Sequence, residues 1–318
     1  MIISSDKPSW LRIVLTYSGS ALRRIWLRLL LTTLLAVVVT ELYVDFDLFH
    51  FDLTVTPFSL IGLALSIFLG FRNNTSYDRF WEGRKLWGRL VNTSRSLTRQ
   101  ILTMIGPRER DPSELAPPAE LEATRRRLVY RLIAYVHALR LHLRDQGDLG
   151  ELAPLLDADE RAALEAELNR PIALLQRMGD DLRALWDRGW IDTIHLPVLE
   201  ASLTALADIQ GGCERIKSTP IPFSYTVLIH RIVAVYCLGL PFGIIDTVGV
   251  FTPVVVMMVA YAFFGLDAVG DEIEDPFGLE PNDLPLSALS RMIEVNLRQR
   301  LGERDLPPLL RPEKGLLA

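Results

Sequence analysis

Uncharged apolar residues gather in long runs that alternate with polar, charged stretches. No charged side chain occurs between residues 53 and 71 or between residues 247 and 266. A helix needs about 20 predominantly apolar residues to cross a bilayer, so each run predicts one transmembrane helix. An apolar share of 49% and a mean hydropathy of +0.22 agree with a membrane protein.

Two further apolar runs are flanked or interrupted by cations. Residues 29–40 reach spanning length when the arginines that precede them lie at the lipid headgroups, with their stems along the helix. Residues 218–245 contain Arg231, which needs a partner such as Asp267 or contact with water. The pattern therefore predicts four transmembrane helices.

The stretch between the second and third spans has the composition of a soluble helical domain, with apolar residues at helical spacing. A Pro-rich loop at residues 107–118 interrupts it, and Asp157 is the predicted N-cap of a helix that has Glu160 at its third position. We expect an all-α membrane protein with five segments: 1–24 as a cytosolic or interfacial segment, 25–80 as transmembrane helices 1 and 2, 81–217 as a large cytosolic helical domain, 218–266 as transmembrane helices 3 and 4, and 267–318 as an acidic segment, a further helix and a flexible tail.

Charged residues are distributed unequally around the predicted spans. Lys and Arg precede the first span, follow the second and precede the third, whereas the connection between spans one and two has acidic residues and no Lys or Arg. Positively charged loops favour the cytoplasmic side of a membrane. This bias predicts a multi-pass protein of the cell inner membrane with both termini in the cytoplasm.

The second span has two ridges of residues spaced four apart, and residues at this spacing lie one above another on a helix. One ridge is bulky and apolar, and the other is small, which allows neighbouring membrane helices to approach closely. Bulky side chains turned toward a shared axis would form a constriction that gates by dewetting, whereas an apolar stripe can equally face lipid or a helix core. The ridges are Leu63, Ile67 and Phe71, and Gly62, Ser66 and Gly70.

Two motifs resemble those of the bestrophin family, and most closely its bacterial branch. The first runs from Ser66-Ile-Phe-Leu-Gly-Phe71 to Tyr77-Asp-Arg-Phe-Trp-Glu-Gly-Arg-Lys-Leu-Trp87, and the second is Gly270-Asp-Glu-Ile-Glu-Asp-Pro-Phe-Gly278. Bestrophins are pentameric ion channels, so the resemblance implies five copies around one central pore. It places the pore neck on the bulky ridge of the second span and a second constriction, at the cytosolic exit, at Ile209.

Acidic residues near the predicted pore ends would attract cations if they face the pore; they are Asp45, Asp47 and Asp52 at the outer mouth and Asp208 at the inner exit. The acidic segment after the last span matches the region where animal bestrophins bind calcium, a cation that takes several oxygen ligands. This segment has fewer carboxylates and two added prolines, so we expect helix capping or salt bridges there and no metal site. The candidate ligands would be Asp275, Glu280 and Asp283.

Residue types that carry catalysis do not form a recognisable pattern. The sequence has no Gly-rich phosphate loop, nucleophile elbow or Cys/His cluster, and its basic residues are spread out rather than concentrated as nucleic-acid binding requires. We therefore expect a protein that is not an enzyme, has no cofactor and does not bind nucleic acid.

The leading hypothesis is the pore-forming subunit of a homopentameric channel for small monovalent ions, with its own copies and membrane lipids as partners. The acidic residues favour sodium or potassium over chloride, and a chloride-selective bestrophin channel is the alternative within the family. A membrane-anchored helical scaffold or sensor is the alternative from another class, and it predicts a monomer.

Overall fold

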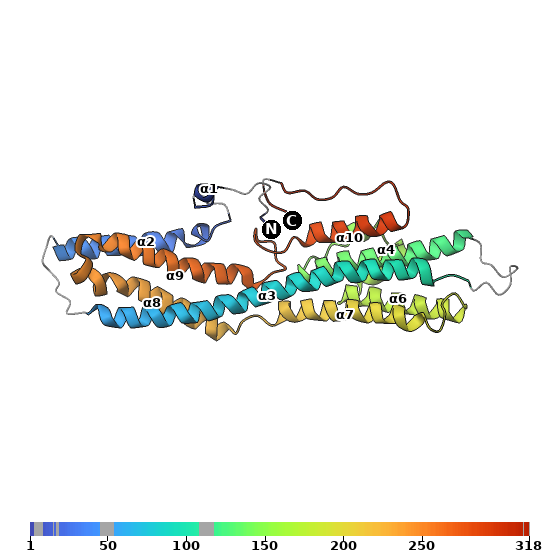
Figure 1. The fold of residues 1–318 in the computed structure, drawn as a ribbon, viewed down its shortest axis with the longest axis horizontal. Coiled ribbons are helices and arrows are strands. Elements are labelled where there is room, and N and C mark those ends of the chain that lie inside the picture. The colour runs from blue at the N-terminus through green and yellow to red at the C-terminus, as the bar shows by residue number, and fades with distance from the viewer. Residues whose placement is uncertain are drawn as a thin grey trace.

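A computed structural model describes residues 1–2, 9–14, 16, 19–44, 54–107, 118–313 and 315–317, and these residues form helices without any β-strand. The molecule is elongated, with one bundle of helices at each end and a single long helix running through both (Figure 1). The α-helices are α1 (Trp10–Val14), α2 (Leu22–Val44), α3 (Val55–Met104), α4 (Pro118–Leu143), α5 (Ala158–Glu165), α6 (Arg170–Asp187), α7 (Leu196–Ser218), α8 (Phe223–Val248), α9 (Thr252–Glu274) and α10 (Leu286–Arg300).

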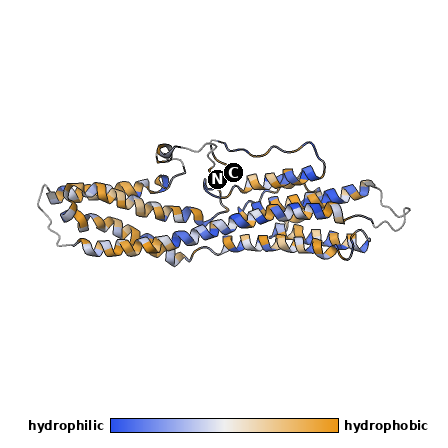
Figure 2. Cartoon of the chain, viewed as in Figure 1, coloured by the Kyte–Doolittle hydropathy of each residue, from blue (hydrophilic) through white to orange (hydrophobic). Residues whose placement is uncertain are grey.

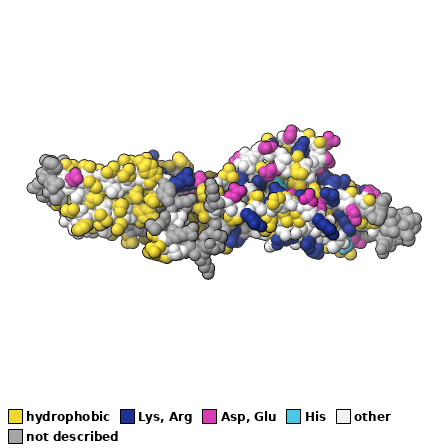
Figure 3. Space-filling model, turned by 90° about the horizontal axis from the view of Figure 1, so that it is seen from above, with side chains coloured by type: hydrophobic (Ala, Val, Ile, Leu, Met, Phe, Trp, Pro, Cys, Tyr) yellow, Lys and Arg dark blue, Asp and Glu magenta, His cyan; other side chains and the backbone are white. Residues whose placement is uncertain are grey.

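The apolar bundle consists of α2, the first part of α3, α8 and α9. Figure 2 shows hydrophobic residues throughout this end of the molecule, and the space-filling view in Figure 3 shows that they also cover its surface. Three stretches are long and apolar enough to cross a membrane: Leu22–Tyr43, Val55–Met104 and Phe223–Glu274. The third stretch contains both α8 and α9, which are separated by a turn at Gly249, where φ is +60° and glycine is favoured.

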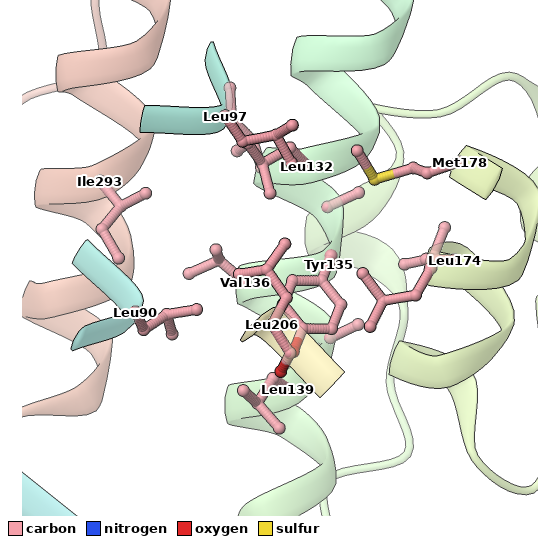
Figure 4. Packing of buried hydrophobic residues seen from close by; sticks show 14 of the residues in the cluster. Leu90, Leu97, Leu132, Tyr135, Val136, Leu139, Leu174, Met178, Leu206 and Ile293 are labelled. Atoms are coloured by element: carbon pink, nitrogen blue, oxygen red, sulfur yellow. The ribbon is translucent and has the colours of Figure 1, made fainter. Parts of the chain in front are cut away.

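The polar bundle surrounds α4 with the second part of α3, α6, α7 and α10. Its core is apolar and contributed by all of these helices (Figure 4). Tyr135 of α4 is fully buried and donates a hydrogen bond from Oη to the carbonyl oxygen of Leu206 in α7 at 2.8 Å. Burial of a tyrosine is therefore compensated by a partner for its hydroxyl group.

Charged contacts join α10 to α4. His137 of α4 is 5% exposed, and its Nε2 lies 3.1 Å from a carboxylate oxygen of Glu294, whereas its Nδ1 is 3.8 Å from Glu151. Burial disfavours the charged imidazole, but the two carboxylates outweigh burial, so the pKa of His137 is raised above its usual 6.5. The protonated side chain thus attracts Glu294 of α10 and Glu151, which follows α4 in the chain, toward α4.

The helix α3 has 50 residues and no break. At 1.5 Å per residue it extends about 75 Å, far beyond a hydrocarbon layer of about 30 Å. The expected segment boundary between residues 80 and 81 falls inside it, because the composition changes there without a proline that would end the helix. One helix therefore belongs to both bundles.

The predicted cap at Asp157 is confirmed, since its side chain accepts a hydrogen bond from the backbone N–H of Glu160 at 2.7 Å. In a capping box the carboxylate of Glu160 would accept a second hydrogen bond, from the backbone N–H of Asp157. Here this carboxylate accepts from the side chain of Arg131 instead. The further helix expected within residues 267–318 is also confirmed, as α10. Most of the loop predicted at 107–118 lies outside the described residues.

Candidate functional site

The bulky ridge of α3 lies on the exposed side of the apolar bundle. Leu63, Ile67 and Phe71 are 63%, 51% and 61% exposed, whereas Leu65 and Leu69, on another face of the same helix, are 2% and 0% exposed in the core with α8 and α9. The ridge therefore points away from the subunit's own helices. This placement is what the neck prediction requires, and a role in a pore stays a prediction.

One more residue continues the bulky ridge. Leu60 lies three residues before Leu63 and is 64% exposed, and residues three apart share a helix face. Sequence reasoning missed Leu60 because only the four-residue spacing was followed. It extends the candidate neck by one turn toward the start of α3.

The small ridge does not act as one surface. A Cβ atom at Gly62 would lie 2.6 Å from the hydroxyl of Tyr236, so this glycine lets α8 of its own subunit approach. Ser66 is exposed and donates to the carbonyl of Gly62 at 2.8 Å, and Gly70 is exposed with open space where a side chain would be. Gly62 therefore packs within its own subunit, Ser66 and Gly70 remain exposed, and a packing face between subunits stays a prediction.

The exposed face of α3 becomes polar and basic beyond the ridge. From residue 72 to the end of α3 the sequence has seven basic residues (Arg72, Arg79, Arg84, Lys85, Arg89, Arg95 and Arg99) and two acidic ones (Asp78 and Glu82). The last five basic residues are all exposed. Any aqueous space that this part of α3 lines would have a positive potential.

The predicted exit constriction is not supported by the position of Ile209. This residue is 0% exposed and belongs to the core of the polar bundle, so helices of its own subunit cover it. Helical periodicity alone did not reveal which side of α7 its own subunit covers. Asp208, the adjacent residue, is exposed, whereas Asp45, Asp47 and Asp52 lie outside the described residues.

A buried ion-pair cluster fixes α3 between α8 and α9 just beyond the bulky ridge. The side chain of Arg72 is 0% exposed, and its Nη1 donates to Oδ1 of Asp267 at 2.7 Å. Its Nη2 contacts Asp271, and His230 of α8 lies 3.0 Å from Asp267 and 3.3 Å from Asp271. Asp267 thus meets Arg72 and His230, a pairing that the sequence could not reveal.

The same cluster contains residue types that can bind a metal ion. His230, Asp267 and Asp271 offer ligand atoms within 4.8 Å of one another. However, Arg72 already donates to an oxygen of each carboxylate, and its positive charge opposes a bound cation. We therefore assign these carboxylates to the arginine.

The two sequence motifs meet at the junction of the bundles. Arg79 of the first motif donates from Nη2 to the carbonyl of Ile216 at 2.6 Å and from Nε to that of Glu274 at 3.0 Å, so it satisfies the last turns of α7 and α9. A Cβ at Gly83 would lie 3.1 Å from the buried ring of Phe277 in the second motif. The motifs therefore hold the junction together by hydrogen bonding and close packing.

The acidic segment is folded around internal partners. Oδ2 of Asp283 accepts from the backbone N–H of Glu280 at 2.7 Å, Oδ1 of Asp275 accepts weakly from that of Phe277 at 3.4 Å, and the Glu280 carboxylate pairs with Arg24 at 2.9 Å. Burial and neighbouring carboxylates raise the pKa of Asp283 to about 6. The three candidate calcium ligands therefore already have backbone or arginine partners, which fits capping and salt bridging better than metal binding.

Comparisons with known proteins agree on one family. Residues 1–299 match the model of the family described as bacterial/fungal bestrophin protein. A protein of Ralstonia nicotianae is 42% identical over 93% of this chain and 94% of its own length, and one of Salmonella typhi is 37% identical over 98% of each; both are named voltage-dependent anion channel-forming proteins. The crystal structure of a bacterial bestrophin homologue from Klebsiella pneumoniae is similar at a TM-score of 0.80 and 35% identity, over 88% of this chain and 99% of that one. The chain therefore belongs to the bestrophin family.

Proposed function

We propose that this chain is the pore-forming subunit of a homopentameric channel that passes small monovalent anions across the cell inner membrane. The observation that carries the proposal is the exposed bulky ridge of α3, which has three large apolar side chains in line and none of them covered by its own subunit. Five copies of the ridge around an axis would form stacked rings of Leu63, Ile67 and Phe71. Such a narrow apolar passage conducts when it wets or widens.

The fold supports a four-span topology. In this topology α2, the first part of α3, α8 and α9 cross the membrane, and the basic second part of α3 lies on the cytoplasmic side. Both termini lie near the middle of the molecule (Figure 1), where the N–H of Leu317 donates to the carbonyl of Met1 at 2.8 Å. A position of both termini at the junction, beyond the apolar bundle, supports placing them on the cytoplasmic side.

The shape of one subunit supports assembly of several copies. The four apolar helices close on a shared core of packed side chains, so a water-filled path requires several copies with their ridges turned toward one axis. The alternative of a monomeric scaffold gives the exposed ridge no role beyond contact with lipid.

The expected cation preference is replaced by an anion preference. The cation preference was expected from four acidic residues, and three of them lie outside the described part of the chain. The related proteins are named as anion channel-forming proteins. The exposed basic residues of α3 support the same sign, because a positive potential near a pore raises the local anion concentration. The apolar neck itself carries no charge with which to discriminate.

Purified full-length protein in a planar bilayer under a potassium chloride gradient tests this function. We expect single-channel currents whose reversal potential lies toward the chloride equilibrium potential. Currents that reverse toward the potassium potential would refute the anion preference while leaving the channel intact. A monomeric mass in detergent together with an absence of current would refute the channel itself.

The neck is tested by a matched pair of variants. Ile67→Ala should increase conductance or open time, because a smaller side chain widens and wets the ring of the neck. Ile61→Ala removes the same side chain, which is also about half exposed, at 47%, but lies six residues before Ile67 on another face of α3, and it should leave the currents close to those of the wild type. Equal effects of the two variants would contradict the assignment of the ridge.

A further inference from the structure

We propose that a cavity between α3 and α10 binds a polyphosphate anion from the cytosol. The cavity has a volume of about 350 Å³, at the lower end of the range for small-molecule sites. It is lined by Arg95, Arg99, Leu102 and Thr103 of α3 and by Asn296 and Arg300 of α10. Both helices contribute their C-terminal parts, because they run in the same direction at this end of the molecule (Figure 1).

The described residues that line the α3–α10 cavity do not compensate its charge. Arg95, Arg99 and Arg300 are exposed, and no acidic residue is among the described residues that line the space. Arg298, two residues before Arg300 on α10, is by contrast paired with Glu294 at 3.3 Å and with Glu303 at 2.7 Å. Three guanidinium groups around one concavity repel one another, and a bound polyanion would relieve this repulsion.

A simpler explanation covers only one of the three arginines. A cation in the last turn of a helix interacts favourably with the helix dipole, and Arg300 lies in the last turn of α10. The last turn of α3 has no basic residue, so Arg95 and Arg99 lie too far back for this effect. Their convergence on Arg300 is better explained by a shared ligand.

The neutral polar groups of the cavity leave anion binding to the arginines. The hydroxyl of Thr103 donates to the carbonyl of Arg99 at 2.9 Å, and the amide of Asn296 donates to that of Met292 at 2.6 Å. Both neutral side chains have therefore used a donor within their own helix. The guanidinium groups supply the free donors, and their planar, two-pronged geometry matches phosphate oxygens.

Position along α3 identifies the source of the phosphate. Arg95 and Arg99 follow Arg72, at the edge of the apolar bundle, by 23 and 27 residues. At 1.5 Å per residue they lie about 35–40 Å from that edge, which is beyond the headgroup layer. The ligand is therefore a free cytosolic anion and not a lipid headgroup.

Calorimetry and thermal unfolding of the full-length protein with pyrophosphate as the probe test the proposal. We expect saturable binding to the wild type and a rise in Tm. The double variant Arg95→Gln/Arg99→Gln should bind at least about tenfold more weakly, since each charged hydrogen bond contributes about a factor of ten or more. The control Arg161→Gln/Arg183→Gln removes the same charge from α5 and α6 and should bind as the wild type does.

Two results would overturn the site. One is an absence of saturable pyrophosphate binding to the wild type, or equal binding by both double variants. The other is a smaller assembly of Arg95→Gln/Arg99→Gln by light scattering without added pyrophosphate, which would assign the arginines to an acidic surface of a neighbouring subunit. Neither readout depends on ionic current, so the site can fail while the channel stands.

Discussion

Replacement of Asp267 by Asn should destabilise the protein by removing the charge that faces Arg72. The two side chains are 1% and 0% exposed and lie 2.7 Å apart. Water cannot replace the lost carboxylate at such a position, and breaking a buried ion pair on one side typically costs about 3–5 kcal/mol. Asp271 still contacts Arg72, so we expect the lower value, about 3 kcal/mol in the free energy of unfolding.

The expected change in Tm follows from chain length. An unfolding entropy of about 2.1 cal/mol/K per residue gives about 0.7 kcal/mol/K for 318 residues. A loss of about 3 kcal/mol therefore lowers Tm by about 4–5 °C. Thermal unfolding of wild type and Asp267→Asn in the same detergent measures the difference.

A matched control separates burial from charge. Asp187→Asn breaks the pair of Asp187 with Arg183, whose atoms lie 3.1 Å apart but whose side chains are 52% and 68% exposed. Exposed pairs of this kind contribute about 0.3–0.5 kcal/mol, so Tm should change by less than about 1 °C. If both variants lower Tm equally, the reasoning about the buried cluster is wrong.

Three further predictions test the packing, the charged contacts and a helix cap. Stability should decrease as the pH rises from 6.5 through the raised pKa of His137, because a deprotonated imidazole loses its attraction to the two carboxylates; His137→Gln should remove this part of the pH dependence of Tm. Gly243→Ala should cost about 1–3 kcal/mol, since its Cβ would lie 2.1 Å from the ring of Phe58, whereas Gly239→Ala, at 3.5 Å from the same ring, should be tolerated in the same unfolding assay. Asp157→Ala should lose an N-cap and about 1 kcal/mol by chemical denaturation.

Local patterns in the sequence predicted the elements that depend on local physics. The apolar runs, the further helix within residues 267–318 and the cap at Asp157 each require only neighbouring residues. The pairing of Arg72 with Asp267 joins residues 195 positions apart, and no periodicity in either helix indicates it.

Faces of helices were harder to assign than the helices themselves. The burial of Ile209 and the contact of Tyr236 with Gly62 depend on which neighbour covers each face. Periodicity gives the spacing of a stripe but not the identity of what lies against it. The exposure of Leu63, Ile67 and Phe71 needed the folded subunit for the same reason.

The unbroken α3 ties the two bundles into one rigid body. Arg79 holds it at the junction of the bundles, eight residues from Phe71 and 20 residues from Arg99, and Arg72 pairs the same helix with Asp267 of α9. Phe71 and Arg99 therefore lie about 12 Å and about 30 Å from Arg79 along one helix. Tilting one bundle against the other would have to bend α3 or break these contacts, so we expect the two bundles to move together.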